Sequence, residues 1–137
     1  MEARYLLDTD ICIYIRRRHP QEVLSRFQRL EPGEAVLSVI TYGELLYGAE
    51  KSLQRERAMH QLQQTILHIP VLPLPPSAAE QYGLIRRELE SEGKMIGNND
   101  LWIAAHAKAA SLILVTNNEG EFKRVRGLKV QNWALAT

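Results

Sequence analysis

The sequence alternates short apolar runs with longer segments of helical periodicity, and this alternation limits the fold more than any other feature. The strand candidates are residues 5–7, 35–38, 112–116 and 128–130. The helix candidates, in which apolar side chains recur three or four positions apart, are residues 22–30, 41–67, 77–90, 98–110 and 118–124. Strands separated by helices favour an α/β domain with a mainly parallel central sheet flanked by helices.

Local chemistry sets several of the element boundaries. We expect residues 41–67 to form two helices that break near Ser52. Thr41 and Glu44 have the spacing of a capping box at the start of the first of these helices. The prolines within residues 69–76 exclude a regular central strand and permit only a short edge strand.

Composition limits the class of protein. With 137 residues, 45% of them hydrophobic, we expect residues 1–137 to form a single domain with its own core. There is no run of ~18 apolar residues and no signal-peptide pattern, so we expect a soluble, cytoplasmic protein without membrane contact. A net charge of +1 gives no global attraction to nucleic acid, and the lone Cys12 excludes an internal disulfide and a cysteine-rich zinc site.

Acidic residues stand where the expected strands end or the expected helices begin. Asp8 follows the first strand, Glu44 lies early in the helix after the second, and Glu121 lies on the helical turn after the strand at residues 112–116. Parallel strands point their carboxyl ends to one edge of a sheet, and ligands gather there. We therefore expect these carboxylates to meet, and Asp100 joins them if its helix begins at the same edge.

Carboxylates that converge in a partly desolvated place repel one another, and a divalent cation is the usual counter-charge. Oxygen ligands alone favour Mg²⁺ or Mn²⁺ over zinc, and such ions serve phosphoryl chemistry. None of the histidines has a partner at ligand or triad spacing: these are His19, His60, His68 and His106. We expect His106, which follows Asp100 on the same helix, to have a packing role.

Most of these acids also have a purely structural interpretation. Glu44 completes the capping box described above, and Glu121 alone is an ordinary surface acid. Asp100 follows Asn98 and Asn99, either of which is expected to cap the helix, and an acid in a first turn suits the helix macrodipole. Asp8 differs from the other acids, because it lies between an apolar strand and an apolar helix and is expected to be partly buried. Taken together, the positions of the four acids favour a functional site over four separate structural roles.

The acidic positions fall within stretches that match a known family in order. These stretches are Leu6–Tyr14, Ser38–Leu45 with Tyr47–Ala49, Ile96–Ala107, and Val115–Asn118 with Glu121, Phe122 and the closing Trp133. Through them the chain resembles the PIN-domain ribonucleases and, within that family, the VapC-type toxins of type II toxin–antitoxin pairs. The resemblance is colinear and covers essentially the whole chain.

The resemblance implies an α/β/α sandwich around a parallel sheet, with an acidic Mg²⁺ site that cleaves RNA. Asp8, Glu44 and Asp100 match the first three acids of the family. For the fourth position, some members have an aspartate where Asn118 stands, and others have an acid that matches Glu121. We favour Glu121, with Asn118 as its polar neighbour.

Two further polar residues lie beside this set. Relatives commonly have asparagine where this chain has Asp10, so the resemblance does not require a second carboxylate there. Asp10 either adds negative charge near the metal or, as we expect, caps a helix that begins at Ile11. Thr116 either holds a carboxylate or a phosphate oxygen through its hydroxyl, or simply ends a strand.

The resulting hypothesis is metal-assisted hydrolysis of an RNA phosphodiester. Asp8 and Asp100 would ligate Mg²⁺ directly, with Mn²⁺ as a substitute, and Glu44 would ligate it or orient the attacking water. Glu121 would complete the acidic shell. Basic residues must flank such a site because each nucleotide carries a phosphate charge, and Arg16, Arg17 and Lys94 are the candidates. The arginines also fit a solvated helix end.

The resemblance further implies partners. VapC-type toxins dimerise and are held inactive by a VapB-type antitoxin, through which the complex reaches operator DNA, and transfer RNA is the substrate expected for the family. Apolar residues in the middle of the chain fit either an antitoxin groove or the core: Leu45, Leu46, Tyr47, Leu53 and Met59.

Two other functions remain open from the sequence. A strand that ends in Asp8-Thr9-Asp10 is similar to the start of haloacid-dehalogenase phosphatases, in which the first aspartate is the nucleophile. Those enzymes also need a downstream lysine and a late acidic pair, and no adjacent acidic pair occurs late in this chain. The third possibility is a catalytically silent module that binds metal or RNA.

Overall fold

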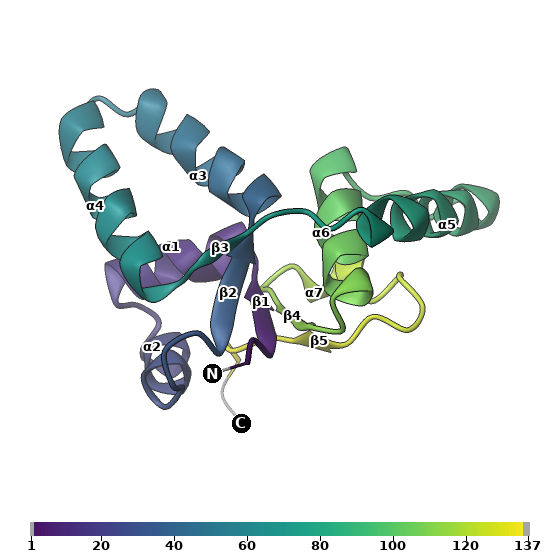
Figure 1. Ribbon diagram of the computed structural model, residues 1–137, viewed down its shortest axis with the longest axis horizontal. Helices are drawn as coiled ribbons and strands as arrows, with labels where there is room; N and C mark the ends of the chain where they lie inside the picture. The colour runs from purple at the N-terminus through teal and green to yellow at the C-terminus, as the bar shows by residue number, and fades with distance from the viewer. Residues whose placement is uncertain (1, 136–137) are drawn as a thin grey trace.

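A five-stranded sheet organises the chain in the computed structural model, which describes residues 2–135 (Figure 1). The strands are β1 (Tyr5–Leu7), β2 (Ala35–Ser38), β3 (Val71–Leu72), β4 (Ile113–Val115) and β5 (Val130–Gln131). Their order across the sheet is β3-β2-β1-β4-β5, and every neighbouring pair is parallel. The expected mainly parallel sheet is thus confirmed, with β3, the proline-flanked segment, at one edge.

The helices connect these strands and lie on both faces of the sheet (Figure 1). They are α1 (Thr9–Arg17), α2 (Gln21–Gln28), α3 (Val39–Glu50), α4 (Arg55–His68), α5 (Ser77–Glu92), α6 (Asn98–Ala109) and α7 (Glu119–Phe122). No helix within residues 2–135 has both the length and the apolar character needed to cross a membrane.

Alternate side chains of β1 enter two separate cores, because successive residues of a strand point to opposite faces. Leu6 packs with buried residues of α5 and α6, including Ile85 and Leu101. Tyr5 and Leu7 pack on the other face, with buried residues of α1 and α2. Two helical layers around one sheet confirm the expected α/β/α sandwich.

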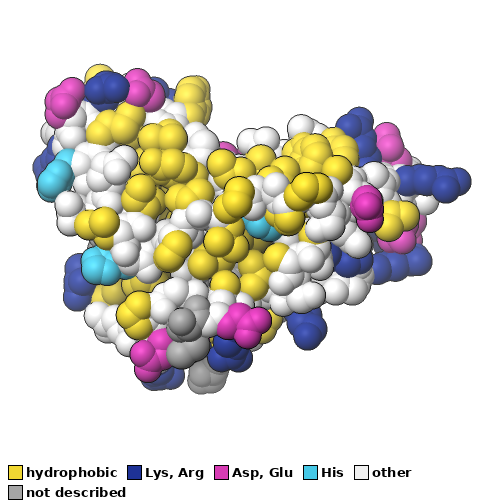
Figure 2. Space-filling model, viewed as in Figure 1, with side chains coloured by type: hydrophobic (Ala, Val, Ile, Leu, Met, Phe, Trp, Pro, Cys, Tyr) yellow, Lys and Arg dark blue, Asp and Glu magenta, His cyan; other side chains and the backbone are white. Residues whose placement is uncertain are grey.

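Helices α3 and α4 form a hairpin that projects beyond the sheet (Figure 1). The chain breaks between Glu50 and Arg55, as expected near Ser52. Tyr47 and Leu53 are exposed on this hairpin, whereas the other apolar residues considered for a groove, Leu45, Leu46 and Met59, are half-buried. Figure 2 shows apolar side chains that extend from the hairpin across the middle of the face turned to the viewer.

The start of α3 contradicts the expected capping box. Ser38 ends β2 and also caps α3, since its Oγ accepts a hydrogen bond from the Ile40 N–H at 3.1 Å. Thr41 therefore lies inside the first turn and caps nothing, and Glu44 lies one turn further on. The chain passes directly from strand to helix, so the last residue of the strand takes the capping position.

The same direct passage occurs after β1. Asp8 caps α1, with Oδ1 accepting from the Thr9 N–H at 2.9 Å, so the expected cap at Asp10 is wrong. Helix α6 begins after Gly97, without a side-chain cap, rather than after Asn98 or Asn99. The last strand also lies later than expected, at Val130–Gln131, where it pairs in register with β4.

The sheet order places one strand at a topological switch point. β1 lies between β2 and β4, and the connections that leave these strands run to different layers. In open parallel sheets, the crevice outside the carboxyl ends of strands at such a point is the usual ligand site. Asp8 and Thr116 directly follow β1 and β4 there.

Candidate active site

Asp8 is fixed from both sides at the end of β1. Its Oδ1 accepts from the Thr9 N–H, and its Oδ2 accepts from the Thr116 hydroxyl at 2.8 Å. The Asp8 N–H donates to the carbonyl of Val115 at 2.9 Å, which ties the carboxylate to β4. Asp8 is only 7% exposed, and Thr116 is fully buried. The hydroxyl of Thr116 therefore holds a carboxylate, one of the two roles expected for it.

The surroundings of Asp8 disfavour its charged form. Burial raises its pKa to about 6, and the negative charge of Asp10 adds to this effect. The hydrogen bonds from Thr116 and Thr9 oppose the shift but do not cancel it, and Glu44 raises it a little further. A buried carboxylate with a raised pKa is stabilised in its charged form by a nearby positive charge.

Asp100 lies in the first turn of α6, and its carboxyl belongs to the same acidic cluster. Burial raises its pKa to about 7, and the charges of Asp8, Glu121 and Glu44 each push it in the same direction. Helix α6 thus begins at the carboxyl edge of the sheet, as the sequence required for Asp100 to join.

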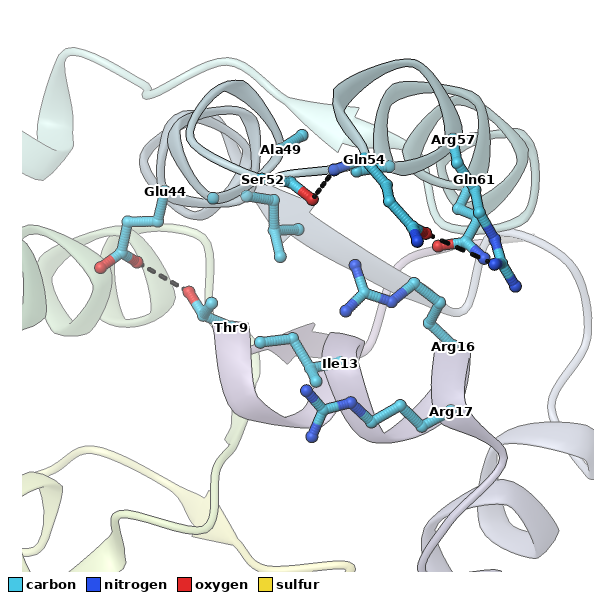
Figure 3. Close-up of a pocket in the computed structure, with 13 residues that line it drawn as sticks. Thr9, Ile13, Arg16, Arg17, Glu44, Ala49, Ser52, Gln54, Arg57 and Gln61 are labelled. Atoms are coloured by element: carbon cyan, nitrogen blue, oxygen red, sulfur yellow. Dashed lines mark hydrogen bonds between the residues drawn. The ribbon is translucent and has the colours of Figure 1, made fainter.

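Glu44 and Glu121 reach this cluster from α3 and α7. Glu44 Oε1 accepts from the Thr9 hydroxyl at 2.7 Å, so the residue after Asp8 orients the second acid (Figure 3). Glu121 Oε2 accepts from the Asn118 side-chain amide at 2.9 Å. Asn118 is therefore the polar neighbour of Glu121, as expected.

The structure thus gathers the acids that were predicted separately along the chain. The chain was also compared with families of known proteins. The family model described as "PIN domain" matches residues 5–128. The chain belongs to the PIN-domain family.

The relatives and solved structures similar to this PIN domain cover it almost entirely. Ribonuclease VapC2 of Haemophilus influenzae is 45% identical over 130 residues, 95% of this chain and 98% of its own length. The tRNA(fMet)-specific endonuclease VapC of Shigella flexneri is 41% identical, over 96% of this chain and 98% of its own. A structure of VapBC2 from Rickettsia felis, bound to a promoter DNA fragment, contains a chain with a TM-score of 0.88 and 36% identity, over 97% and 99% of the two chains.

These similarities confirm the resemblance to VapC-type ribonucleases and place the PIN domain among them. They also remove the basis for the phosphatase alternative, which rested on the strand-end Asp8-Thr9-Asp10 alone. Asp10 instead serves the loop after β4, because its Oδ2 accepts from the Asn117 N–H at 3.0 Å.

The loop after β4 is held at several points. The Asn118 N–H donates to the Thr116 hydroxyl at 2.9 Å, and the side-chain amide of Asn117 donates to the Tyr14 hydroxyl at 3.1 Å. The Asn132 amide in turn donates to Asn117 Oδ1 at 3.0 Å. These contacts position the loop that carries Thr116 and leads to Glu121.

The donor set of this PIN domain suits a hard divalent cation. Carboxylate oxygens are the only charged groups in the cluster. Burial, and after it repulsion from neighbouring carboxylates, raises the pKa values of Asp8 and Asp100, and a cation relieves both effects. As they stand, no three acidic, histidine or cysteine side chains of residues 2–135 enclose a common point at metal-binding distances.

The predicted basic residues lie outside the acidic cluster. Arg16 and Arg17 are at the far end of α1, and Lys94 lies in a separate open pocket with Lys123 and Arg124. These basic residues therefore flank the acidic cluster on different sides.

Sequence reasoning missed Thr9 and Asn117, whose partners are distant in the chain. It interpreted His106 correctly, since the ring is 1% exposed and its Nδ1 lies 2.9 Å from Ser38 Oγ. Burial lowers the pKa of His106, which favours the neutral ring in this packed position. The position of Thr9 inside the motif around Asp8 was the only available signal for its role.

Proposed function

We propose that this PIN domain is a Mg²⁺-dependent endoribonuclease, with Mn²⁺ as a possible substitute, and that transfer RNA is its substrate. The observation that carries the proposal is the convergence of Asp8, Glu44, Asp100 and Glu121 at the switch point of the sheet. The tRNA(fMet)-specific relative at 41% identity supports the choice of substrate.

Asp8 and Asp100 would hold the cation, because burial and neighbouring negative charges raise the pKa of both, so that both gain from a positive partner. When bound, the cation lowers the pKa of water and stabilises charge on the phosphate oxygens. Thr116 keeps Asp8 oriented, and Thr9 keeps Glu44 where it can accept a proton from the attacking water or take part in binding. Glu121 completes the acidic shell beside Asp100.

We also propose the partners of a VapC-type toxin. The Rickettsia felis relative was solved as a VapBC complex on promoter DNA, which supports a cognate VapB-type antitoxin through which this chain reaches operator DNA. Val39 and Tyr47 are exposed apolar side chains of α3, and a second copy would pack on them as a homodimer. We expect these encounters, and the encounter with RNA, in the cytoplasm.

The test is an assay of purified protein, free of antitoxin, with transfer RNA, ribosomal RNA and a DNA strand of similar length. We expect discrete RNA fragments in Mg²⁺, none in EDTA, and none from Asp8→Asn under either condition. Asn is also a good N-cap, so this variant retains the start of α1. Intact RNA at high wild-type concentration would contradict the proposal and favour the silent binding module.

A further inference from the structure

A groove runs from the acidic cluster along α1, between this helix and the α3–α4 hairpin (Figure 3). Thr9 and Glu44 line the end near the acids, and the cavity has a volume of about 460 Å³. Figure 3 shows Arg16 extending from α1 and Arg57 from α4 toward this space, and Arg17 of α1 also lines the groove. The groove therefore joins the acidic cluster to a basic region.

The basic region of the groove carries charge with no internal counter-charge. Within residues 2–135, Arg16, Arg17 and Arg57 take part in none of the ion pairs. Arg57 only donates a long hydrogen bond to the side chain of Gln54, at 3.4 Å. Guanidinium groups match phosphate oxygens in a forked geometry, and gathering several of them in one groove favours a polyanionic ligand.

The opposite flank of the acidic cluster differs. Of its basic residues, Lys123 pairs with Glu119 at 3.2 Å and Arg124 donates to the carbonyl of Met95 at 3.0 Å, whereas Lys94 takes part in none of the ion pairs within residues 2–135. This flank therefore offers Lys94 as a cation outside the ion pairs, whereas the groove gathers three arginines.

The length of α1 sets the distance between the two ends of the groove. Thr9 and Arg16 are seven residues apart on the helix, which corresponds to roughly 10 Å at ~1.5 Å per residue. A stacked nucleic-acid strand advances about 3.4 Å per nucleotide, so the arginines lie within a few nucleotides of the acidic cluster. A strand cleaved at the cluster can therefore place nearby phosphates on them.

We infer that the groove holds the RNA strand on one side of the cleaved bond, with backbone phosphates on Arg16, Arg17 and Arg57. This inference rests on the proposed function and adds the direction in which the substrate leaves the site. An acidic protein segment fits less well, because its carboxylates would meet Glu44 at the end of the groove. An RNA strand meets that end with the phosphate that is to be cleaved.

The test measures binding of a fluorescein-labelled oligouridylate across a salt series, in Mg²⁺. The protein carries Asp100→Asn to prevent cleavage, with or without Arg16→Gln and Arg57→Gln. Each lost phosphate contact lowers the salt slope of single-strand binding by about 0.7. We expect the double groove change to lower the slope by ~1.4 and to raise Kd roughly 10- to 30-fold at ~0.1 M salt.

The matched control removes two exposed arginines outside the groove, with Arg29→Gln at the end of α2 and Arg87→Gln on α5. The net charge changes by the same amount as in the groove variant, but neither arginine lines the groove. We therefore expect less than a ~2-fold change in Kd. Equal losses in both double variants, or no loss in either, would overturn the inference.

A second arm replaces the RNA with labelled polyglutamate. Groove-dependent binding of polyglutamate without groove-dependent binding of oligouridylate would assign the groove to an acidic protein segment and overturn the inference. The proposed function fails separately. Groove-dependent RNA binding without cleavage by the wild-type protein would contradict the nuclease activity but support the RNA-binding groove. RNA cleavage by the wild type, with a salt slope that the groove variant leaves unchanged, would support the nuclease activity and overturn the groove.

Discussion

At the scale of single residues, the two aspartates of the Asp8-Thr9-Asp10 stretch have different tasks. Asp8 caps α1 and faces the other acids, whereas Asp10 accepts the N–H of Asn117 and so fixes the loop after β4. Burial raises the pKa of Asp10, and its Oδ1 is buried without a hydrogen-bond partner. The contact with the loop therefore needs one acceptor oxygen of Asp10 rather than its charge.

This division of tasks predicts that Asp10→Asn and Asp10→Ala differ. Asparagine keeps an acceptor for the Asn117 N–H, so we expect RNA cleavage within ~3-fold of the wild type. Alanine removes the acceptor, and we expect the free energy of unfolding to fall by about 1 kcal/mol and cleavage to fall further than in the asparagine variant. Urea unfolding and cleavage kinetics measure both. Equal behaviour of the two variants would show that Asp10 does not position the loop.

The sequence indicated the candidate acids but not the residues that orient them. Asp8 was recognisable because it follows an apolar strand, and direction alone placed the other strand-end acids at the same edge. The Thr9–Glu44 hydrogen bond spans 35 residues and the Asp10–Asn117 bond spans 107. Such contacts depend on how α1 packs against α3 and the β4 loop, and no local pattern encodes that packing.

At the scale of elements, strand and helix positions followed well from periodicity, whereas helix caps did not. The Thr41–Glu44 spacing fits a capping box, but a local pattern cannot show where the preceding strand ends. β2 extends to Ser38, whose hydroxyl both caps α3 and meets Nδ1 of the buried His106 on α6. One side chain thus links a strand, the helix that follows it and the helix that carries Asp100.

Ser38→Ala tests this link. Loss of a cap costs about 1 kcal/mol, and leaving the buried His106 nitrogen without its partner costs a further ~1–3 kcal/mol. We expect the free energy of unfolding to fall by roughly 2–4 kcal/mol in urea titrations. Ser91→Ala is the control, because its hydroxyl bonds the Glu88 carbonyl on an exposed turn and its loss should cost under ~0.5 kcal/mol. Similar losses in both variants would contradict the link.

At the scale of the whole molecule, the acidic cluster opposes folding unless it is neutralised. The pKa values of Asp8 and Asp100 rise from 3.8 to about 6 and about 7 in the folded protein. Between pH 3.8 and about 7, the folded state still binds protons at these carboxyls that the unfolded chain has released. The free energy of unfolding therefore falls as pH rises from about 4 to 7. A cation that binds the ionised carboxylates reverses this loss.

Thermal unfolding at several pH values measures this balance. In EDTA we expect Tm to fall between pH 5 and pH 8, and we expect Mg²⁺ to raise Tm at pH 8 but to have little effect at pH 5, where protons compete with the ion. Asp8→Asn should show a smaller fall with pH and a smaller response to Mg²⁺. A Tm that rises through this range in EDTA, or equal stabilisation by Mg²⁺ at both pH values, would contradict the account of the cluster.

The most direct measurement of the central claim is the initial rate of RNA cleavage against Mg²⁺ concentration for wild type, Asp8→Asn, Asp100→Asn and the double variant. If the two carboxylates act together in one metal site, each single change should lower the rate by at least ~100-fold, and the double change should lower it little further. Full Mg²⁺-dependent cleavage by either single variant would contradict the claim.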